Sequence, residues 1–484
     1  MRYTEIAIAK PFSGCPKINL AELFGASPKK PVILRIPVTG ERPIKLKAEN
    51  LPEGLMLEDN VIRGSVDKAG EYKAIITAEN SLGTDEKELT IEIKEDGVLL
   101  TPLMGFTTWN AFGYEVTQDK VEKVAEKIEA LGLTEYGYSY INIDSGWQGE
   151  YGGRFDAIMP NEKFPDMKGF CDRLHKKGYK CGIYSSPMLY SFGCNMNHKP
   201  LPPGCTQGEP DDRFSDLRGG IGVIRKEENN ARQWAEWGFD YLKYDWRPCD
   251  PYNADIMKKA LASTHRDFGF CVTVRANVDY HTYWSKYCSS YRCNPDSNGT
   301  WENFRELIKS YYDFIAYINK GHFFDLDMLD TGYSEFFAGL GYYENPDFGY
   351  TEDEQLAVFS ARAFFSSPIQ ISTNFENINE FELSMYCNEE VIAINQDSKF
   401  SAAKPYMILE DGKKIIHVYK KMLSNGDYAL CIFNLGETKE VVKVYLDGPS
   451  KIRDVWGKCD NEDGALLHKV MHPHTVRMFR ITSL

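Results

Sequence analysis

The sequence predicts an α/β protein, a (β/α)8 TIM barrel flanked by an N-terminal β-sandwich-like domain and a C-terminal antiparallel β-sandwich. Three observations support this fold class. The first 99 residues read as short strands separated by turns. From Thr101 onward, strand-like and helix-like segments alternate, which is typical of a parallel α/β fold. Beyond Asp397 the β pattern returns. We therefore expect domains at 1–99, 100–399 and 400–484.

The composition limits the classes of partner. The chain has 484 residues, which is enough for more than one domain, and its 43% hydrophobic and 26% charged residues are ordinary for a globular protein. A net charge of -14 argues against a nucleic-acid or anionic-membrane partner. The sequence holds no apolar run of about eighteen residues, so we expect no membrane insertion.

Neither the compartment nor the oligomeric state follows from the sequence. The start, Met1–Ile6, lacks the apolar core of a signal peptide. This fits either a cytoplasmic protein or a periplasmic or secreted protein whose signal has been removed.

The N-terminal domain is predicted from short runs with turn signals between them, the pattern of a small sandwich. These runs are Val32–Pro37, Ile44–Ala48, Tyr72–Ala78 and Leu89–Lys94. The phrase Asn50–Glu58, followed by Ile62–Gly64 and Gly70–Tyr72, resembles the immunoglobulin-like modules that precede bacterial glycosidases. Because a fold does not give a function, we expect a generic β-domain without a binding role.

The middle of the chain supplies the eight strands of a barrel. The predicted strands are Met104–Trp109, Tyr140–Asp144, Lys180–Tyr184, Tyr241–Asp245, Cys271–Arg275, Ser290–Cys293, Phe323–Asp327 and Ile369–Ser372. Amphipathic segments predict helices at Lys120–Leu131, Met167–Lys177, Glu227–Trp237 and Trp301–Ile318. The long loop Pro187–Gly219 is rich in Pro and Gly, and such a loop on the upper rim of a barrel typically shapes a pocket.

The C-terminal domain is predicted from four strand-like runs and a tight turn at Ser424–Gly426, which are typical of an antiparallel sandwich. The runs are Ile415–Tyr419, Tyr428–Phe433, Glu440–Tyr445 and Thr475–Phe479.

Acidic residues recur at the ends of the predicted barrel strands, where barrel enzymes place their chemistry. They are Asp144, Asp245, Asp296, Asp325 and Asp327. Lys243 lies two residues before Asp245 and would point to the same face of its strand. A nearby cation favours the ionised acid, which suits a nucleophile. The alternative is that Lys243 and Asp245 form a structural ion pair.

Two of these acids would suffice for glycoside hydrolysis, one as nucleophile or base and one as proton donor. Asp296 is the candidate donor if burial raises its pKa, although it could instead cap the helix that begins near Trp301. Trp109, Trp147 and Trp246 follow or end strands and could stack on a sugar, but each alone is more often a core residue.

Several segments together resemble one known family. Thr101–Asn110, Ile143–Trp147, Gly182–Tyr184, Lys243–Asp245, Arg292–Asp296, Asp325–Leu329 and Val391–Asp397 are similar, in order, to glycoside hydrolase family 27, the α-galactosidase and α-N-acetylgalactosaminidase family. The resemblance implies a retaining enzyme with Asp245 as nucleophile and Asp296 as acid/base. It also implies a terminal-sugar pocket lined by Trp109, Asp144, Ser145, Tyr184, Lys243, Arg292 and Asp327.

The sequence departs from the family pattern in ways that leave the sugar open. Ser145 stands where galactose-acting members usually carry a second Asp, which grips the axial hydroxyl and the group at carbon six. A hydroxyl cannot accept two charge-assisted bonds as a carboxylate can. Phe106 and Tyr291 replace usual Trp residues, and Arg275 or Asn277 could face the substituent at carbon two.

The substrate hypothesis is a terminal α-galactoside in an oligosaccharide or polysaccharide. The alternatives are an α-N-acetylgalactosaminide, a β-L-arabinopyranoside, or a binding-only protein on a degenerate barrel. We expect neither a cofactor nor a metal, because no closely spaced Cys or His pair and no metal cage of acids is present. A disulfide among Cys194, Cys205 and Cys249 stays open.

Overall fold

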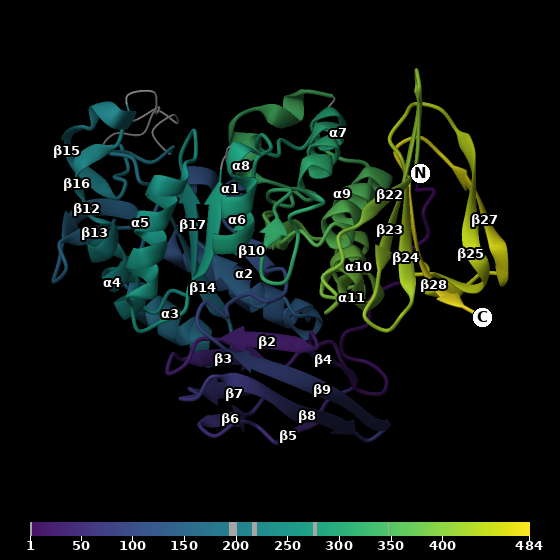
Figure 1. Cartoon of the computed structure of the whole chain (residues 1–484), viewed down its shortest axis with the longest axis horizontal. Coiled ribbons are helices and arrows are strands. Elements are labelled where there is room, and N and C mark those ends of the chain that lie inside the picture. Colours follow the sequence, from purple (N-terminus) through teal and green to yellow (C-terminus); the bar gives the residue numbers. More distant parts are fainter. Residues whose placement is uncertain (1, 193–200, 215–219, 274–277, 347) are drawn as a thin grey trace.

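The computed structural model describes residues 2–192, 201–214, 220–273, 278–346 and 348–484. Figure 1 shows a barrel with the N-terminal β region below it and a C-terminal β region beside it. The α/β fold class with two flanking β regions is confirmed.

Eight parallel strands form the barrel, and each of them lies within or overlaps a predicted strand. They are β10 Met104–Thr107, β11 Tyr140–Asn142, β14 Lys180–Ser185, β17 Tyr241–Asp245, β18 Gly269–Thr273, β19 Ser290–Tyr291, β20 Phe323–Phe324 and β21 Ile369–Ile371. Neighbouring strands pair in chain order, and β10 also pairs with β21. A parallel bridge between Leu329 and Ile371 closes the ring. Nearly every residue of these strands is buried, which explains their continuous apolar runs.

Helices between the strands form the outer layer, and local sequence signals set their ends. They include α2 Gln118–Ala130, α3 Met167–Lys176, α4 Glu227–Trp237, α5 Pro251–Ala262, α7 Trp301–Ser310 and α9 Glu352–Phe364. Thr351 and Glu354 form a capping box at the start of α9. At the start of α7 the N-cap is Thr300, whose side chain accepts from the backbone of Asn303. Asp296 therefore does not cap this helix.

Shorter elements complete the layer around the barrel. They are α1 Trp109–Phe112, α6 His281–Tyr287, α8 Glu335–Gly339, α10 Glu380–Tyr386 and α11 Glu389–Asn395. Two hairpins were not predicted, β12 Gln148–Gly152 with β13 Ala157–Pro160, and β15 Thr206–Pro210 with β16 Gly222–Arg225. They follow β11 and β14, and the second includes part of the predicted long loop.

The N-terminal region packs two small sheets around their own apolar core. The larger sheet contains β2 Leu23–Ala26, β5 Lys45–Glu49, β8 Gly70–Asn80 and β9 Gly83–Ile93, and the smaller contains β3 Val32–Arg35, β6 Leu55–Glu58 and β7 Val61–Gly64. A two-stranded pair joins β1 Lys17–Ile18 to β4 Val38–Thr39.

This region contacts the barrel at the amino ends of the strands. The Ser27 amide donates to Asp267 just before β18 (2.7 Å), and Lys180, the first residue of β14, lies 5.1 Å from the Phe24 ring centroid. Arg35 donates to the carbonyl of Lys177 (2.7 Å). The N-terminal region is therefore at the opposite end of the barrel from the strand-end acids.

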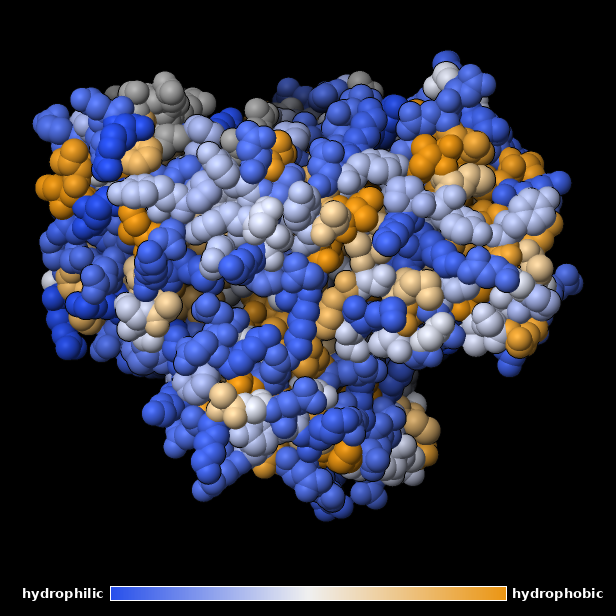
Figure 2. Space-filling model, in the orientation of Figure 1, coloured by the Kyte–Doolittle hydropathy of each residue, from blue (hydrophilic) through white to orange (hydrophobic). Residues whose placement is uncertain are grey.

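The C-terminal region is an antiparallel sandwich. Its strands are β22 Lys404–Asp411, β23 Lys414–Met422, β24 Tyr428–Asn434, β25 Glu440–Asp454, β26 Cys459–Asp460, β27 Gly464–Met471 and β28 Val476–Ser483. The indole of Trp456 donates to Ser360 of α9 (3.0 Å), which joins the sandwich to the barrel. Figure 2 shows a largely hydrophilic face with small hydrophobic groups. No helix in the described part of the chain is long and apolar enough to cross a membrane.

A buried ammonium lies where the sandwich meets the barrel. Lys421 of β23 donates to the hydroxyl of Ser366 (2.7 Å) and the carbonyl of Ile394 (2.5 Å). Its side chain is buried, and this burial lowers the pKa of Lys421 to about 7. The charged form of Lys421 is therefore less stable in this interface than in water.

The stability of this interface should depend on pH. Because the folded pKa of Lys421 lies below its ordinary value, the folded state binds fewer protons than the unfolded state above about pH 7. The free energy of unfolding should therefore rise from about pH 7 to about pH 9 relative to that of Lys421→Met, as measured by thermal melting. The matched control is Lys420→Met, which removes a surface pair with Asp447. A pH-independent difference between wild type and Lys421→Met would contradict the expectation.

Candidate active site

The carboxyl ends of successive barrel strands gather the predicted site residues. Asp144 follows β11, Asp245 ends β17, Arg292 follows β19, and Asp327 lies just after β20. In the register of the sheet, Tyr184 of β14 pairs with Lys243 of β17. These positions lie at one end of the ring, so side chains far apart in sequence can interact.

Lys243 makes its ion pair with Asp144. Its Nζ donates to Asp144 Oδ2 at 2.7 Å, and both residues are largely buried. Burial acts to lower the pKa of Lys243, but the charges of Asp144, Asp245 and Asp327 outweigh it and raise that pKa. The hydroxyl of Thr108 accepts from the Asp144 amide (2.9 Å), which ties this pair to the segment that carries Trp109.

Asp245 has two carboxylate oxygens in different environments. Oδ2 accepts a hydrogen bond from the Tyr184 hydroxyl at 2.9 Å, and Oδ1 is buried with no hydrogen-bond partner among the described residues. The residue is 8% exposed. Burial raises the pKa of Asp245 to about 6, although Lys243 and Arg292 act to lower it. Lys243 therefore acts in the expected direction, toward the ionised acid, but burial outweighs it and the net shift of the pKa is upward.

Arg292 is a buried cation that joins three neighbouring strands. Its Nε donates to Thr273 Oγ1 (2.7 Å), Nη1 to Asp327 Oδ2 (2.8 Å) and Nη2 to Asp296 Oδ1 (2.7 Å). The Asp296 side chain is 67% exposed. Burial acts to raise the pKa of Asp296, but the charge of Arg292 and its hydrogen bond lower it. This is opposite to the direction that the sequence hypothesis required.

Asp327 adopts a backbone conformation that is unusual for a residue other than glycine. Its φ is +69°, in the left-handed region. Its amide donates to Asp325 Oδ1 (2.8 Å), and Arg362 Nε donates to its carbonyl (3.1 Å). Burial, together with the charge of Asp327, raises the pKa of Asp325 to about 6. Such local strain is often found at functional sites.

The remaining predicted residues divide between the carboxyl end of the barrel and the core. Ser145 is buried, and its hydroxyl lies 3.4 Å from that of Ser191. Trp109 is partly exposed and packs on Phe336, with ring centroids 5.2 Å apart. Trp147 and Trp246 are fully buried, and their indole nitrogens donate to the Tyr184 carbonyl and to Asp250, so they belong to the core.

Comparison with known proteins identifies the family. A family model described as "Alpha galactosidase A" matches residues 214–397, and one described as "Alpha galactosidase C-terminal beta sandwich domain" matches residues 413–481, together slightly more than half of the chain. The chain belongs to the α-galactosidase (melibiase) family, glycoside hydrolase family 27. It is an α-galactosidase-like glycoside hydrolase.

Relatives of this hydrolase cover most of its length. α-Galactosidase A of Cellvibrio japonicus is 29% identical over 69% of this chain and 76% of its own. α-Galactosidase 2 of Arabidopsis thaliana is 26% identical over 81% and 91%. A crystal structure of a candidate α-galactosidase/melibiase from Bacteroides fragilis superposes with a TM-score of 0.86 at 29% identity, covering 98% of this chain and 99% of that one.

Sequence reasoning missed several buried polar residues near the candidate site. Gln148 donates to Ser191 (3.5 Å), and Ser297 donates from its hydroxyl to Asp330 (2.9 Å). Asp330 offered a signal, because it is a further acid three residues after Asp327. Ser191 and Ser297 offered none, since isolated serines are common in loops. Arg275 and Asn277 lie outside the described residues.

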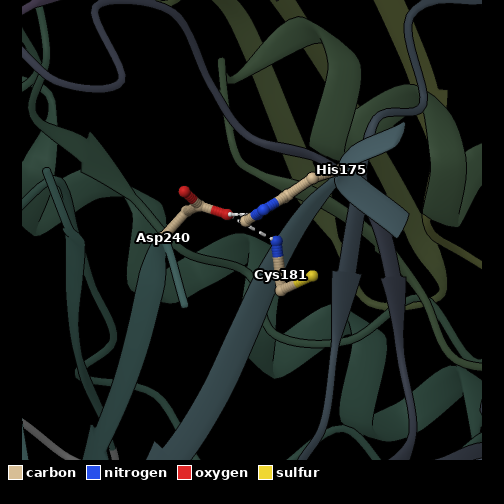
Figure 3. A group of neighbouring side chains, drawn as sticks. All are labelled: His175, Cys181 and Asp240. Carbon is tan, nitrogen blue, oxygen red and sulfur yellow. Dashed lines mark hydrogen bonds and ion pairs between the residues drawn. The ribbon is translucent and has the colours of Figure 1, made fainter. Parts of the chain in front are cut away.

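A second cluster of titratable groups lies at the amino ends of the strands (Figure 3). His175 Nε2 is 2.8 Å from Asp240 Oδ2, which also accepts from the Cys181 amide (2.9 Å), and Arg266 donates to Asp240 Oδ1 (2.5 Å). The His175, Cys181 and Asp240 ligand atoms are close enough to hold a metal ion. Burial acts to lower the pKa of His175, but Asp240 raises it to about 9. His175 and Arg266 both lie within ion-pair distance of Asp240, so the cluster fits a structural ion-pair network.

Two of the three loop cysteines, Cys205 and Cys249, are described, and both are buried. Cys205 lies 3.0 Å from the Ser185 hydroxyl, and the Cys249 thiol donates to the Trp246 carbonyl (3.0 Å). They do not form a disulfide with each other. Cys194 lies outside the described residues.

The burial of Asp245 should lower the stability of the enzyme at neutral pH. Because the folded pKa is raised to about 6, the destabilising effect grows as pH rises from about 4 to about 6 and stays constant above that. Asp245→Asn should therefore raise the free energy of unfolding at pH 7 by on the order of 2 kcal/mol, and by much less near pH 4. Thermal melting at both pH values measures this difference.

The matched control for this prediction is Asp144→Asn. That change removes the partner of a buried cation, Lys243, and should lower the melting temperature. A loss of stability in Asp245→Asn as large as that in Asp144→Asn would show that burial of Asp245 is not unfavourable.

Proposed function

We propose that this protein is a retaining exo-glycosidase that hydrolyses terminal α-galactoside-type linkages by double displacement. One observation carries the proposal. Asp245 has one oxygen held by Tyr184, while the other is buried without a hydrogen-bond partner in the described part of the chain. An oxygen in this state is a strong nucleophile, because hydrogen bonds neither occupy nor weaken its lone pairs.

The second carboxylate belongs to Asp296. The charge of Asp296 contributes to the raised pKa of Asp245, which is consistent with two carboxylates near each other. In retaining glycosidases such groups lie about 5 Å apart. The Asp296 side chain is exposed and fixed through Arg292, so it can meet the oxygen of a departing group.

The reaction takes two steps. Oδ1 of Asp245 attacks the anomeric carbon, the glycosidic bond breaks, and Asp296 gives its proton to the leaving oxygen. Asp296 then takes a proton from water, which attacks the same carbon and releases Asp245. Two inversions give net retention of configuration.

The charges around the site suit the transition state. The acids Asp144, Asp245 and Asp327 outnumber the cations Lys243 and Arg292 near the reacting position. The oxocarbenium-like transition state carries positive charge, and prearranged negative groups stabilise it. We propose that the sugar pocket is lined by Trp109, Asp144, Ser145, Tyr184, Lys243, Arg292 and Asp327, with Tyr184 acting mainly on Asp245.

Loss of the nucleophile should abolish turnover. We expect Asp245→Asn to lower kcat for a nitrophenyl glycoside by at least about 10³-fold with the fold intact by circular dichroism. NMR of the wild-type reaction should show the first product with the configuration of the substrate. Unchanged turnover, or a first product of inverted configuration, would defeat the mechanism.

A second substrate is favoured by Ser145. This residue and its neighbours Ser191 and Gln148 are neutral, so the site lacks the carboxylate that would grip the group at carbon six. A β-L-arabinopyranoside has the ring stereochemistry of galactose without that exocyclic carbon. A β-L-arabinopyranoside would therefore lose less binding free energy than an α-galactoside does when this carboxylate is absent.

The sugar preference should respond to one substitution. Ser145→Asp should raise the ratio of kcat/KM for nitrophenyl α-galactoside over nitrophenyl β-L-arabinopyranoside by about tenfold, because a charge-assisted hydrogen bond is restored. Nitrophenyl α-N-acetylgalactosaminide completes the panel, and Ser145→Ala is the matched control. An unchanged ratio would exclude Ser145 as the residue that sets the preference.

A further inference from the structure

Asp296 lies in the segment between β19 and α7. The next residue, Ser297, forms hydrogen bonds to two different acids. The amide of Ser297 donates to Asp327 Oδ2 at 2.7 Å. The hydroxyl of Ser297 donates to Asp330 Oδ2 at 2.9 Å. Ser297, Asp327 and Asp330 are all buried, in contrast to the exposed side chain of Asp296.

Asp330 is an unfavourable residue for the stability of the fold at this position. Its Oδ1 is buried with no hydrogen-bond partner among the described residues, and burial raises the pKa of Asp330 to about 6. The nearby cation Arg362 donates instead to the carbonyls of Leu326, Asp327 and Met328. A buried carboxyl group with one unsatisfied oxygen calls for an explanation beyond packing.

The contacts form a closed circuit around Asp296. Asp327 Oδ2 accepts from both Arg292 and the Ser297 amide, and Arg292 donates in turn to Asp296. The Asp296 carboxylate is exposed, so its direction depends on its hydrogen bond with Arg292 and on the backbone at 296–297. The Ser297–Asp330 bond is a buried contact that fixes this backbone independently of Arg292, beside the bond from Asn303 Nδ2 to the Asp296 carbonyl (3.1 Å).

We propose that Ser297 and Asp330 are positioning residues that aim the carboxyl group of Asp296 at the leaving oxygen. The inference rests on the proposed acid/base role of Asp296. Loosening the bond lets the 296–297 backbone shift, and the proton donor then meets the glycosidic oxygen at a poorer distance and angle. Proton transfer requires heavy atoms within about 3 Å, so a small displacement is felt.

The positioning role predicts an effect that depends on the leaving group. A good leaving group such as nitrophenolate departs with little protonation, whereas an alkoxide needs the proton. A merely structural role of Ser297 and Asp330 would lower the activity on both kinds of substrate equally. The value of kcat/KM reports the step in which the leaving group departs, so it separates the two roles.

The experiment compares nitrophenyl and methyl glycosides of the sugar that the wild-type enzyme hydrolyses fastest. Ser297→Ala and Asp330→Ala should each lower kcat/KM for the methyl glycoside about tenfold and for the nitrophenyl glycoside by less than about threefold. Asp330→Asn keeps an acceptor oxygen for the Ser297 hydroxyl and should restore most of the lost activity. In a double variant, Ser297→Ala with Asp330→Ala, the losses should not add, because both remove the same bond.

Two further variants make the outcome decisive. Asp296→Ala should show the largest leaving-group dependence. If this variant shows no such dependence, the acid/base role of Asp296 itself is overturned. Thr117→Ala removes the N-cap of the remote helix α2 and should lower the melting temperature without leaving-group dependence. If Asp296→Ala shows the dependence while Ser297→Ala loses both activities equally or neither, the positioning role alone is overturned. Ser297→Ala decides the matter if Asp330→Ala does not fold.

Discussion

The guanidinium of Arg292 is the interaction on which the site depends. Its three hydrogen bonds reach Thr273, Asp327 and Asp296, which belong to three successive parts of the barrel wall. A buried cation without its acids would be strongly unfavourable, and so would the acids without the cation. The planar fork of Arg holds two carboxylates in a fixed relation that a lysine could not impose. Arg292 therefore connects Asp296 to Asp327 and to Thr273, which is the residue that pairs with Asp245 in the sheet.

The charged residues are arranged differently at the two ends of the barrel. At the amino ends, His175 and Arg266 both pair with Asp240, and their carbonyls accept from Arg63 and Lys30 of the N-terminal region. At the carboxyl ends, Asp245 keeps an oxygen without a partner in the described structure, and Asp330 does the same. Satisfied charges stabilise a fold, whereas unsatisfied ones cost stability and are retained where chemistry needs them.

The sequence predicted the fold well because its signals are local. Each barrel strand is a short apolar run buried on both faces, and the acids that follow Tyr241–Tyr244 and Phe323–Phe324 mark the carboxyl ends of those runs. The sequence did not predict that Lys243 pairs with Asp144, because the two residues are 99 positions apart. Only the closed ring of strands brings Asp144 Oδ2 to 2.7 Å from Lys243 Nζ. For the same reason, the sequence did not predict that the pKa of Asp245 is raised and that of Asp296 is lowered. Burial and the reach of Arg292 are properties of the packed site, and spacing along the chain does not encode them.

The pKa shifts of Asp245 and Asp296 run in the directions opposite to those that the proposed catalytic roles need. Asp245 holds its proton to about pH 6, while Arg292 lowers the pKa of Asp296. The proposed mechanism needs an ionised Asp245 and a proton on Asp296. We propose that a bound sugar excludes water from the exposed Asp296 carboxylate, which raises its pKa by desolvation. In the same proposal, the sugar places an electron-poor carbon against Oδ1 of Asp245, which favours the ionised form of that group. Substrate binding then shifts the proton to Asp296, and part of the binding energy is used for that transfer.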